Sequence, residues 1–245
     1  MALRLGLGLG GASRRKVVAI VVALFVLAAA GAVAWRWVQP TAAQPPHFLE
    51  LASGVYILPK PDAIAEFQLV KHDDTPFGND ALRGRWTFMI FGYTFCPDFC
   101  PTTLAVFNEV HTQLAQRPGG VQDLQFVMVS VDPERDTTAL LSRYVPQFNP
   151  DFIGITGDAA VIARLADSVG AVYTKVPGSS ADSYLVDHSS AVLLVNPQGR
   201  LQGIFAAPHV AQDMVQGYLK IREQAGAAAQ AESPADSAPL RVSAR

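Results

Sequence analysis

The chain has 245 residues and a formal net charge of −2 at pH 7, with 19 basic and 21 acidic side chains. This length suits one ordinary domain with extensions, or two small domains. The charges are mixed, and no basic stripe is interleaved with aromatic residues, so composition excludes an extended nucleic-acid-binding surface and we expect no nucleic-acid partner.

An uncharged apolar run lies near the N-terminus, at Val17–Trp35, and is long enough to span a bilayer as a helix. Basic residues cluster before it, so the positive-inside rule predicts a cytoplasmic tail at residues 1–16 and a membrane anchor at residues 17–37. The alternative is a signal peptide cleaved at the small residues Ala32–Ala34. Under either interpretation the remaining chain is exported. We expect a single-pass protein of the bacterial inner membrane with its folded domain in the oxidising periplasm.

Two further segments lack the residues needed for a core. Residues 38–62 are rich in proline, which favours an extended tether. Residues 225–245 are rich in alanine, serine and proline, and we expect them to be disordered. The folded domain is therefore predicted at residues 63–224.

Within that domain, hydrophobic periodicity predicts strands that alternate with helices. In chain order the predicted elements are strand Ala65–Asp73, strand Arg85–Tyr93, helix Pro101–Arg117, strand Leu124–Asp132, helix Thr137–Val145, helix Asp158–Gly170, a strand hairpin across Ser189–Ala206, and helix Val210–Gln224. Alternation of this kind implies a partly parallel sheet with helices on its faces. A strand, a cysteine-containing loop and a helix, followed much later by a hairpin, form the layout of a thioredoxin-like α/β fold.

Both cysteines of the chain, Cys96 and Cys100, lie in the loop FGYTFCPDFCP between a predicted strand and helix. Proline is well tolerated at the first helical position, so Pro101 predicts a helix start there, with Cys100 as the N-cap. The helix dipole favours a thiolate at Cys100, whereas Asp98 opposes it. A turn of this length allows a disulfide, and the same closeness allows two thiolates to bind Cu(I) or Zn(II). A redox pair, a metal site and two inert thiols all remain open at this point.

Among the five histidines, His188 has the most informative position. It stands directly before the first strand of the predicted hairpin, and in a thioredoxin-like layout that strand start faces the cysteine loop. Two sulfur atoms and one nitrogen would suit copper. Asp187 and Ser189 could orient the imidazole ring. The alternative is a histidine that is hydrogen-bonded at a strand edge and binds no metal.

Three stretches together resemble the Sco/SenC family of membrane-anchored copper proteins: FGYTFCPDFCP, VSVDPERDT at residues 129–137, and YLVDHSSAVLLVNPQGR. The resemblance covers residues 63–224. It implies a thioredoxin-like fold behind a single N-terminal transmembrane helix, with copper, as Cu(I) or Cu(II), bound by Cys96, Cys100 and His188. One departure is Phe95, where many relatives carry histidine. We expect copper binding to survive this change, with altered loop packing or redox tuning.

The resemblance also implies a role in assembling CuA, the dinuclear copper site in subunit II of cytochrome c oxidase. Family members are thought to deliver copper, to reduce the target's cysteines, or both. Such a role would add a periplasmic copper donor and a thiol reductant to the partners. The alternative is a thiol-disulfide oxidoreductase in which Cys96 attacks a disulfide and Cys100 resolves the product, although the three-residue spacing of the cysteines argues against a dedicated catalyst. A thiol peroxidase would need an activating threonine and arginine, which the sequence around Cys96 does not show.

The stretch VDPERDT has a physical interpretation of its own. Asp132 ends a predicted strand at the functional edge of the sheet, and Asp136 or Thr137 could cap the helix that follows. A structural corner explains this stretch more simply than a direct metal ligand does. Asp132 could still lie near the cysteine loop and support the site from behind.

Overall fold

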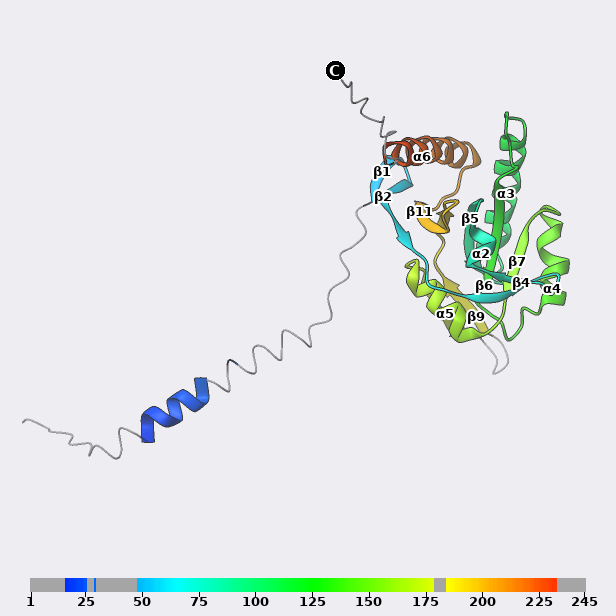
Figure 1. Cartoon of the computed structure of the whole chain (residues 1–245). Helices are drawn as coiled ribbons and strands as arrows, with labels where there is room; N and C mark the ends of the chain where they lie inside the picture. The colour runs from blue at the N-terminus through cyan, green and yellow to red at the C-terminus, as the bar shows by residue number, and fades with distance from the viewer. Residues whose placement is uncertain (1–15, 26–28, 30–47, 179–183, 233–245) are drawn as a thin grey trace, which may run out of the picture. The chain divides into compact units, whose positions relative to one another are not determined.

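The structure is a computed structural model that describes residues 16–25, 29, 48–178 and 184–232. It divides into two units, residues 1–46 and residues 47–245. In the first unit, residues 16–25 are helical (Figure 1). No helix among the described residues is both long and apolar enough to cross a membrane. The predicted anchor at Val17–Trp35 lies partly outside the described residues, and the predicted cytoplasmic tail almost wholly so.

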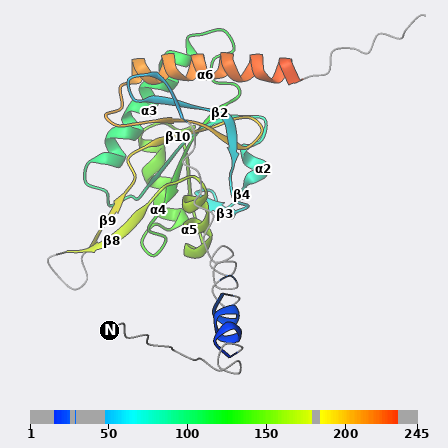
Figure 2. The same cartoon turned by 90° about the vertical axis from the view of Figure 1, so that its left-hand side faces the viewer.

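A mixed sheet of nine strands organises the second unit, in the order β1-β2-β11-β10-β5-β6-β7-β3-β4. In that order the strands are β1 Leu49–Ala52, β2 Val55–Ala63, β11 Arg200–Phe205, β10 Val192–Val195, β5 Trp86–Gly92, β6 Leu124–Ser130, β7 Ile153–Thr156, β3 Gln68–Lys71 and β4 Pro76–Gly78. Strands β5, β6 and β7 run parallel, and the flanking strands pair antiparallel. A separate two-stranded ribbon joins β8 Tyr173–Pro177 to β9 Tyr184–His188 (Figure 2).

Helices cover both faces of the sheet. They are α2 Asn79–Leu82, α3 Phe99–Ala115, α4 Thr138–Tyr144 with the 3-10 turn η1 Val145–Gln147, α5 Ala159–Ser168 and α6 Ala211–Glu232. Side chains of β5 alternate between two cores: Phe88 packs with α3, α4 and α6 on one face, and Met89 packs with α2 and α5 on the other. All seven β5 residues are buried, which is why this strand is a continuous apolar run in the sequence.

Most predicted elements are present, and the expected α/β alternation is confirmed. The predicted strands at Arg85–Tyr93 and Leu124–Asp132 are β5 and β6, and the predicted hairpin is β10 and β11. The predicted helix at Asp158–Gly170 is α5, and Gly170 follows it with a positive φ of 71°, as a C-terminal glycine does. The short strands β4, β7, β8 and β9 were not predicted.

The predicted tether is wrong over its second half, because Leu49–Ala52 and Val55–Ala63 form sheet strands. The prolines of β2 suggested an extended tether, but they fall where its register with β11 shifts, between the pairs Gly203↔Ile57 and Leu201↔Asp62. A proline costs no ladder hydrogen bond at such a break. The predicted tail from residue 225 is also wrong in part, since α6 continues to Glu232. Alanine, the strongest helix former, dominates this extension; residues 233–245 lie outside the described residues.

Candidate metal centre

The cysteine loop lies at the carboxyl end of the parallel strands. β5 ends at Gly92 and β6 ends at Ser130, and these two residues are register partners. The loop that follows β5 and the turn that follows β6 therefore emerge side by side at one edge of the sheet. Functional sites of open α/β sheets lie at this edge, as the sequence predicted for the cysteines.

The helix after the loop begins earlier than predicted. α3 starts at Phe99, so Asp98 is the N-cap and Cys100 is the second helical residue. Pro101 did not mark the start because a proline anywhere in the first turn loses no helical hydrogen bond. The Asp98 side chain forms no cap hydrogen bond; instead the Cys96 Sγ accepts one from the Cys100 amide at 3.3 Å. Cys96 is half-buried on the loop, and Cys100 is 1% exposed.

Gly92 provides the space that the Cys100 sulfur occupies. A Cβ atom at this position would lie 2.6 Å from the Cys100 Sγ, well inside van der Waals contact. The last residue of β5 is therefore a glycine because the sulfur lies directly over its backbone.

We predict that Gly92→Ala weakens copper binding about tenfold or more, because the added methyl group must displace the Cys100 sulfur from the metal centre. The measurement is a competitive Cu(I) titration of the folded variant. Gly226→Ala is the matched control, since nothing lies within 4 Å of a Cβ atom there. Equal copper affinity in the two variants would show that the position of Cys100 does not limit binding.

His188 reaches the two cysteines from the end of β9. Its Nε2 lies 3.3 Å from the Cys100 Sγ and 3.8 Å from the Cys96 Sγ. The three side-chain atoms all lie within 4.8 Å of one another, and within the described ranges no other group of His, Cys, Asp or Glu side chains has such a geometry. The structure thus brings together the three residues that the sequence proposed as ligands.

A backbone carbonyl orients the histidine ring. The His188 Nδ1 lies 3.0 Å from the Ser189 carbonyl oxygen, so Nδ1–H donates and the Nε2 lone pair faces the sulfurs. The Ser189 hydroxyl instead accepts from the Val172 amide at 2.8 Å. Asp187 is exposed, and none of the described hydrogen bonds joins it to the ring. Of the two residues predicted to orient the ring, Ser189 therefore does so, through its backbone carbonyl. Asp187 does not, and its charge only helps to raise the pKa of His188.

The turn after β6 supports the site from behind. Asp132 is fully buried, forms an ion pair with Arg135 and accepts a hydrogen bond from the Tyr184 hydroxyl at 2.7 Å. It reaches the metal centre through these two residues and not by direct contact with a sulfur. Thr137 caps α4, as the sequence allowed.

Asp136, which the sequence offered only as a helix cap, fixes the cysteine loop. Its buried carboxylate accepts hydrogen bonds from the Thr94 amide at 3.0 Å, the Thr94 hydroxyl at 2.5 Å and the Ser130 hydroxyl at 2.6 Å. Burial raises the pKa of Asp136, and these hydrogen bonds oppose that rise. The sequence did contain a signal for this role, because a second acidic residue follows Asp132 closely. A helix cap explained the presence of Asp136 equally well.

The charge of the thiol pair is concentrated on Cys96. The neighbouring Cys100 thiol lowers the pKa of Cys96 to about 3, and His188 and two backbone amides add to the effect against burial. The same contact with Cys96, together with burial, raises the pKa of Cys100. Burial alone would lower the pKa of His188, but contact with Cys96 raises it above the ordinary value. Near neutral pH the site therefore holds one thiolate, at Cys96, and one protonated thiol, at Cys100.

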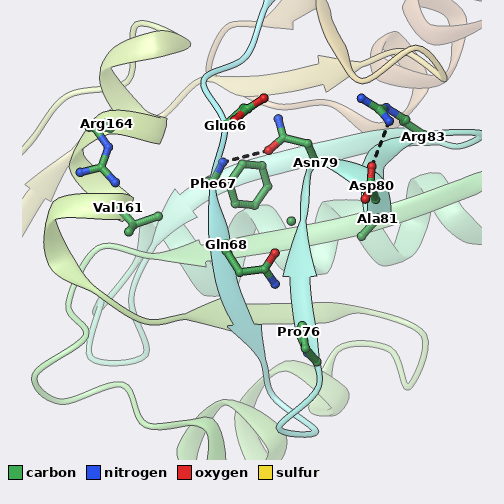
Figure 3. Close-up of a pocket in the computed structure, with 11 residues that line it drawn as sticks. Glu66, Phe67, Gln68, Pro76, Asn79, Asp80, Ala81, Arg83, Val161 and Arg164 are labelled. Carbon is green, nitrogen blue, oxygen red and sulfur yellow. Dashed lines mark hydrogen bonds and ion pairs between the residues drawn. The ribbon is translucent and has the colours of Figure 1, made fainter.

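A pocket of about 680 Å³ lies elsewhere on the domain, lined by residues of β3, β4, α2 and α5 (Figure 3). Its Asp80 and Arg83 side chains pair with each other at 3.0 Å. None of the three proposed ligands lines it, so we place the functional site at the Cys96–Cys100–His188 cluster.

A model of the SCO1/SenC family matches residues 57–223, which include the whole cluster. The chain belongs to the SCO1/SenC family. The matched region begins within β2, in agreement with a domain that starts before residue 63.

Solved structures of similar proteins contain copper. This SCO1/SenC chain is similar to the crystal structure of Arabidopsis thaliana ScoI with copper bound, with a TM-score of 0.62 and 33% identity over 66% of this chain and 98% of that one. It is also similar to Bradyrhizobium japonicum ScoI with copper bound, with a TM-score of 0.58 and 30% identity over 66% of this chain and 98% of that one. These similarities confirm the predicted thioredoxin-like α/β fold.

Curated relatives come from bacteria and mitochondria. A Stutzerimonas stutzeri protein whose name refers to copper binding is 37% identical over 156 residues, covering 64% of this chain and 75% of that protein. The mitochondrial SCO2 homologue of Bos taurus is 36% identical over 149 residues, covering 61% of this chain and 56% of that protein. The matched region therefore spans between about half and three quarters of the length of these relatives.

Proposed function

We propose that Cys96, Cys100 and His188 bind one copper ion, and that the protein is a copper chaperone for cytochrome c oxidase. The observation that carries this proposal is the convergence of two sulfurs and one imidazole nitrogen within 4.8 Å. Soft thiolates select Cu(I), and the imidazole adds a ligand that Cu(II) also accepts. The copper-bound structures of two relatives support copper as the metal.

Copper titration of the full-length protein tests this proposal. We expect about one equivalent of Cu(I) to bind when the cysteines are reduced, and none when they form a disulfide, because only the reduced pair offers two thiolates. Failure of the protein to bind Cu(I) or Cu(II) in either redox state would exclude the chaperone function.

We propose that the client is the CuA site of subunit II of cytochrome c oxidase. Membership of the SCO1/SenC family supports this assignment, as does the half-exposed Cys96, which a partner's ligands can reach. The copper-loaded protein should transfer its metal to the reduced soluble domain of subunit II. The appearance of the CuA absorption spectrum measures this transfer. Retention of copper in the presence of this domain would contradict the assignment.

We also propose that Val17–Trp35 anchors the chain in the inner membrane, with residues 47–245 in the periplasm. The uncharged apolar run and the basic residues before it support this topology. In spheroplasts, added protease should degrade the domain. Without protease, the domain should remain with the membrane fraction after high-salt washing. A soluble periplasmic product that begins near Ala34 would instead identify a cleaved signal peptide.

A second candidate is a thiol-disulfide reductase, favoured by the lowered pKa of Cys96 beside the buried Cys100. The Cys96 thiolate would attack a target disulfide and release one target thiolate. Cys100 would lose its proton and attack the mixed disulfide, which frees the second target thiolate and leaves Cys96–Cys100 oxidised. A periplasmic thiol reductant must then restore the pair. Reduction of the subunit II disulfide by a copper-free protein would support this activity beside copper delivery.

Copper affinity should rise with pH. Cys96 is already a thiolate near neutral pH, whereas Cys100 keeps its proton, so metal binding must displace about one proton from Cys100, and also the proton of any His188 that is still charged. We expect the apparent affinity for Cu(I) to increase at least about tenfold per pH unit between about pH 6 and pH 8. Competition with a chelator of known pH dependence measures this slope. A flat profile would mean that both thiols are already ionised in the free protein.

A further inference from the structure

Arg135 lies where the three segments that build the metal centre meet. It belongs to the turn after β6, where it forms an ion pair with the buried carboxylate of Asp132. Its Nη1 donates a hydrogen bond to the Tyr184 carbonyl oxygen at 3.2 Å, and the Tyr184 hydroxyl donates to Asp132 at 2.7 Å. Arg135, Asp132 and Tyr184 therefore form a closed set of contacts between the turn and the start of β9.

Aromatic rings from both ligand-bearing segments contact the same guanidinium group. The Arg135 Cζ lies 3.7 Å from the ring centroid of Tyr184, which begins β9, and 4.7 Å from that of Phe95, which directly precedes Cys96. A planar guanidinium favours stacking of this kind on aromatic faces. Phe95 is 52% exposed and contacts Arg135 with its ring. The residue directly before Cys96 thus supplies a ring for Arg135.

Side-chain contacts hold the strand that carries His188 against the domain, among them the buried Val186 side chain and the Lys175–Glu134 ion pair at 2.6 Å. β8 and β9 form a ribbon that is not hydrogen-bonded to the nine-stranded sheet, and a two-stranded ribbon alone is at best marginally stable. Besides the Tyr184 contacts, the Val186 amide donates to the Tyr93 hydroxyl at 3.1 Å. His188 is the last residue of the same strand.

We propose that Arg135 is a positioning residue of the metal centre, which holds β9, and with it His188, against the loop that carries Cys96. The proposal rests on the proposed function only for the identity of the metal, because the contacts of Arg135 join the two segments directly. Arg135 itself supplies no ligand. Its planar group, and not its charge alone, is the required feature, since it must contact Asp132, Tyr184 and Phe95 together.

Amide hydrogen exchange of the reduced, copper-free protein tests the positioning role first. In Arg135→Ala, the Val186 amide should exchange about tenfold faster or more, while Val127 in the central strand β6 keeps its rate. Arg135→Lys keeps the charge and should still show much of this increase. Arg83→Ala, which removes an exposed arginine at another site, is the control and should change neither rate. Unchanged exchange at Val186, or equal acceleration at Val127, would overturn the proposal.

A double-mutant cycle with Cu(I) then tests the link to His188. Arg135→Ala should weaken Cu(I) binding about tenfold in the wild-type background, but by less than about twofold when His188→Ala is also present. An equal loss in both backgrounds would overturn the proposal, because Arg135 would then act on the cysteines. If Arg135→Ala does not fold, two milder variants replace it in the hydrogen exchange measurement and in the double-mutant cycle. They are Arg135→Lys and Tyr184→Phe, the second of which removes only the hydroxyl. A wild-type protein that binds no copper would refute the proposed function, while the exchange experiment would still decide the positioning role.

Discussion

His188→Ala is expected to lose Cu(II) binding while Cys96 and Cys100 still form a disulfide. The His188 Nε2 lies 3.3 Å and 3.8 Å from the two sulfurs and is the only nitrogen ligand in the described cluster. Removal of groups that merely orient a metal ligand already lowers affinity about 10–100-fold, so loss of the ligand itself should cost at least about 100-fold. Two thiolates would remain for Cu(I), which should bind more weakly.

The loss can be measured by the thiolate-to-Cu(II) absorption and the electron paramagnetic resonance spectrum. His72→Ala is a suitable control, because His72 contacts the Gly154 backbone through its Nδ1 at 3.0 Å, away from the sulfurs. Oxidation of the variant should still close the disulfide, which mass spectrometry detects. A variant that binds Cu(II) normally and matures the oxidase would refute the role of His188 as a ligand.

Replacement of either cysteine by serine is expected to lower Cu(I) affinity by several orders of magnitude, roughly a thousandfold or more, because a neutral hydroxyl cannot replace a soft thiolate. The remaining thiols should differ in reactivity. Cys100→Ser leaves the half-exposed Cys96 beside His188, whereas Cys96→Ser leaves a buried thiol.

Alkylation rates near neutral pH separate the two cysteines. Cys96 in Cys100→Ser should react at least about tenfold faster than Cys100 in Cys96→Ser, since the thiolate is the nucleophile and burial raises the pKa of Cys100. Equal copper affinity in the wild type and Cys100→Ser would remove the buried cysteine from the ligand set. A faster reaction at Cys100 would reverse the assignment of the thiolate to Cys96.

The parts of the fold with strong periodic patterns could be predicted from the sequence. β5 and β6 are buried along their whole length, and α3 buries Leu104, Phe107 and Val110 at helical spacing. β2 could not be predicted in the same way, because its prolines indicate a tether until the register shift opposite β11 explains them. The four-residue strand β7 is too short for periodicity to identify.

The three proposed metal ligands could be predicted from the sequence, but the residues that position them could not. His188 was proposed from its place before the hairpin and from the family resemblance, and the structure brings its Nε2 to both sulfurs. The N-cap was misplaced because Pro101 fits any position in the first turn. Arg135 was missed because its partners lie far from it on opposite sides in the sequence: Phe95 is on the loop after β5, and Tyr184 begins β9.

X-ray absorption at the copper edge of the Cu(I)-loaded full-length protein tests the central claim most directly. The two sulfurs and one nitrogen that converge in the structure predict two sulfur scatterers and one imidazole nitrogen per copper ion. The imidazole contribution should disappear in His188→Ala, and one sulfur should disappear in Cys100→Ser. A spectrum with no sulfur scatterers, or one that His188→Ala leaves unchanged, would contradict the proposed metal centre.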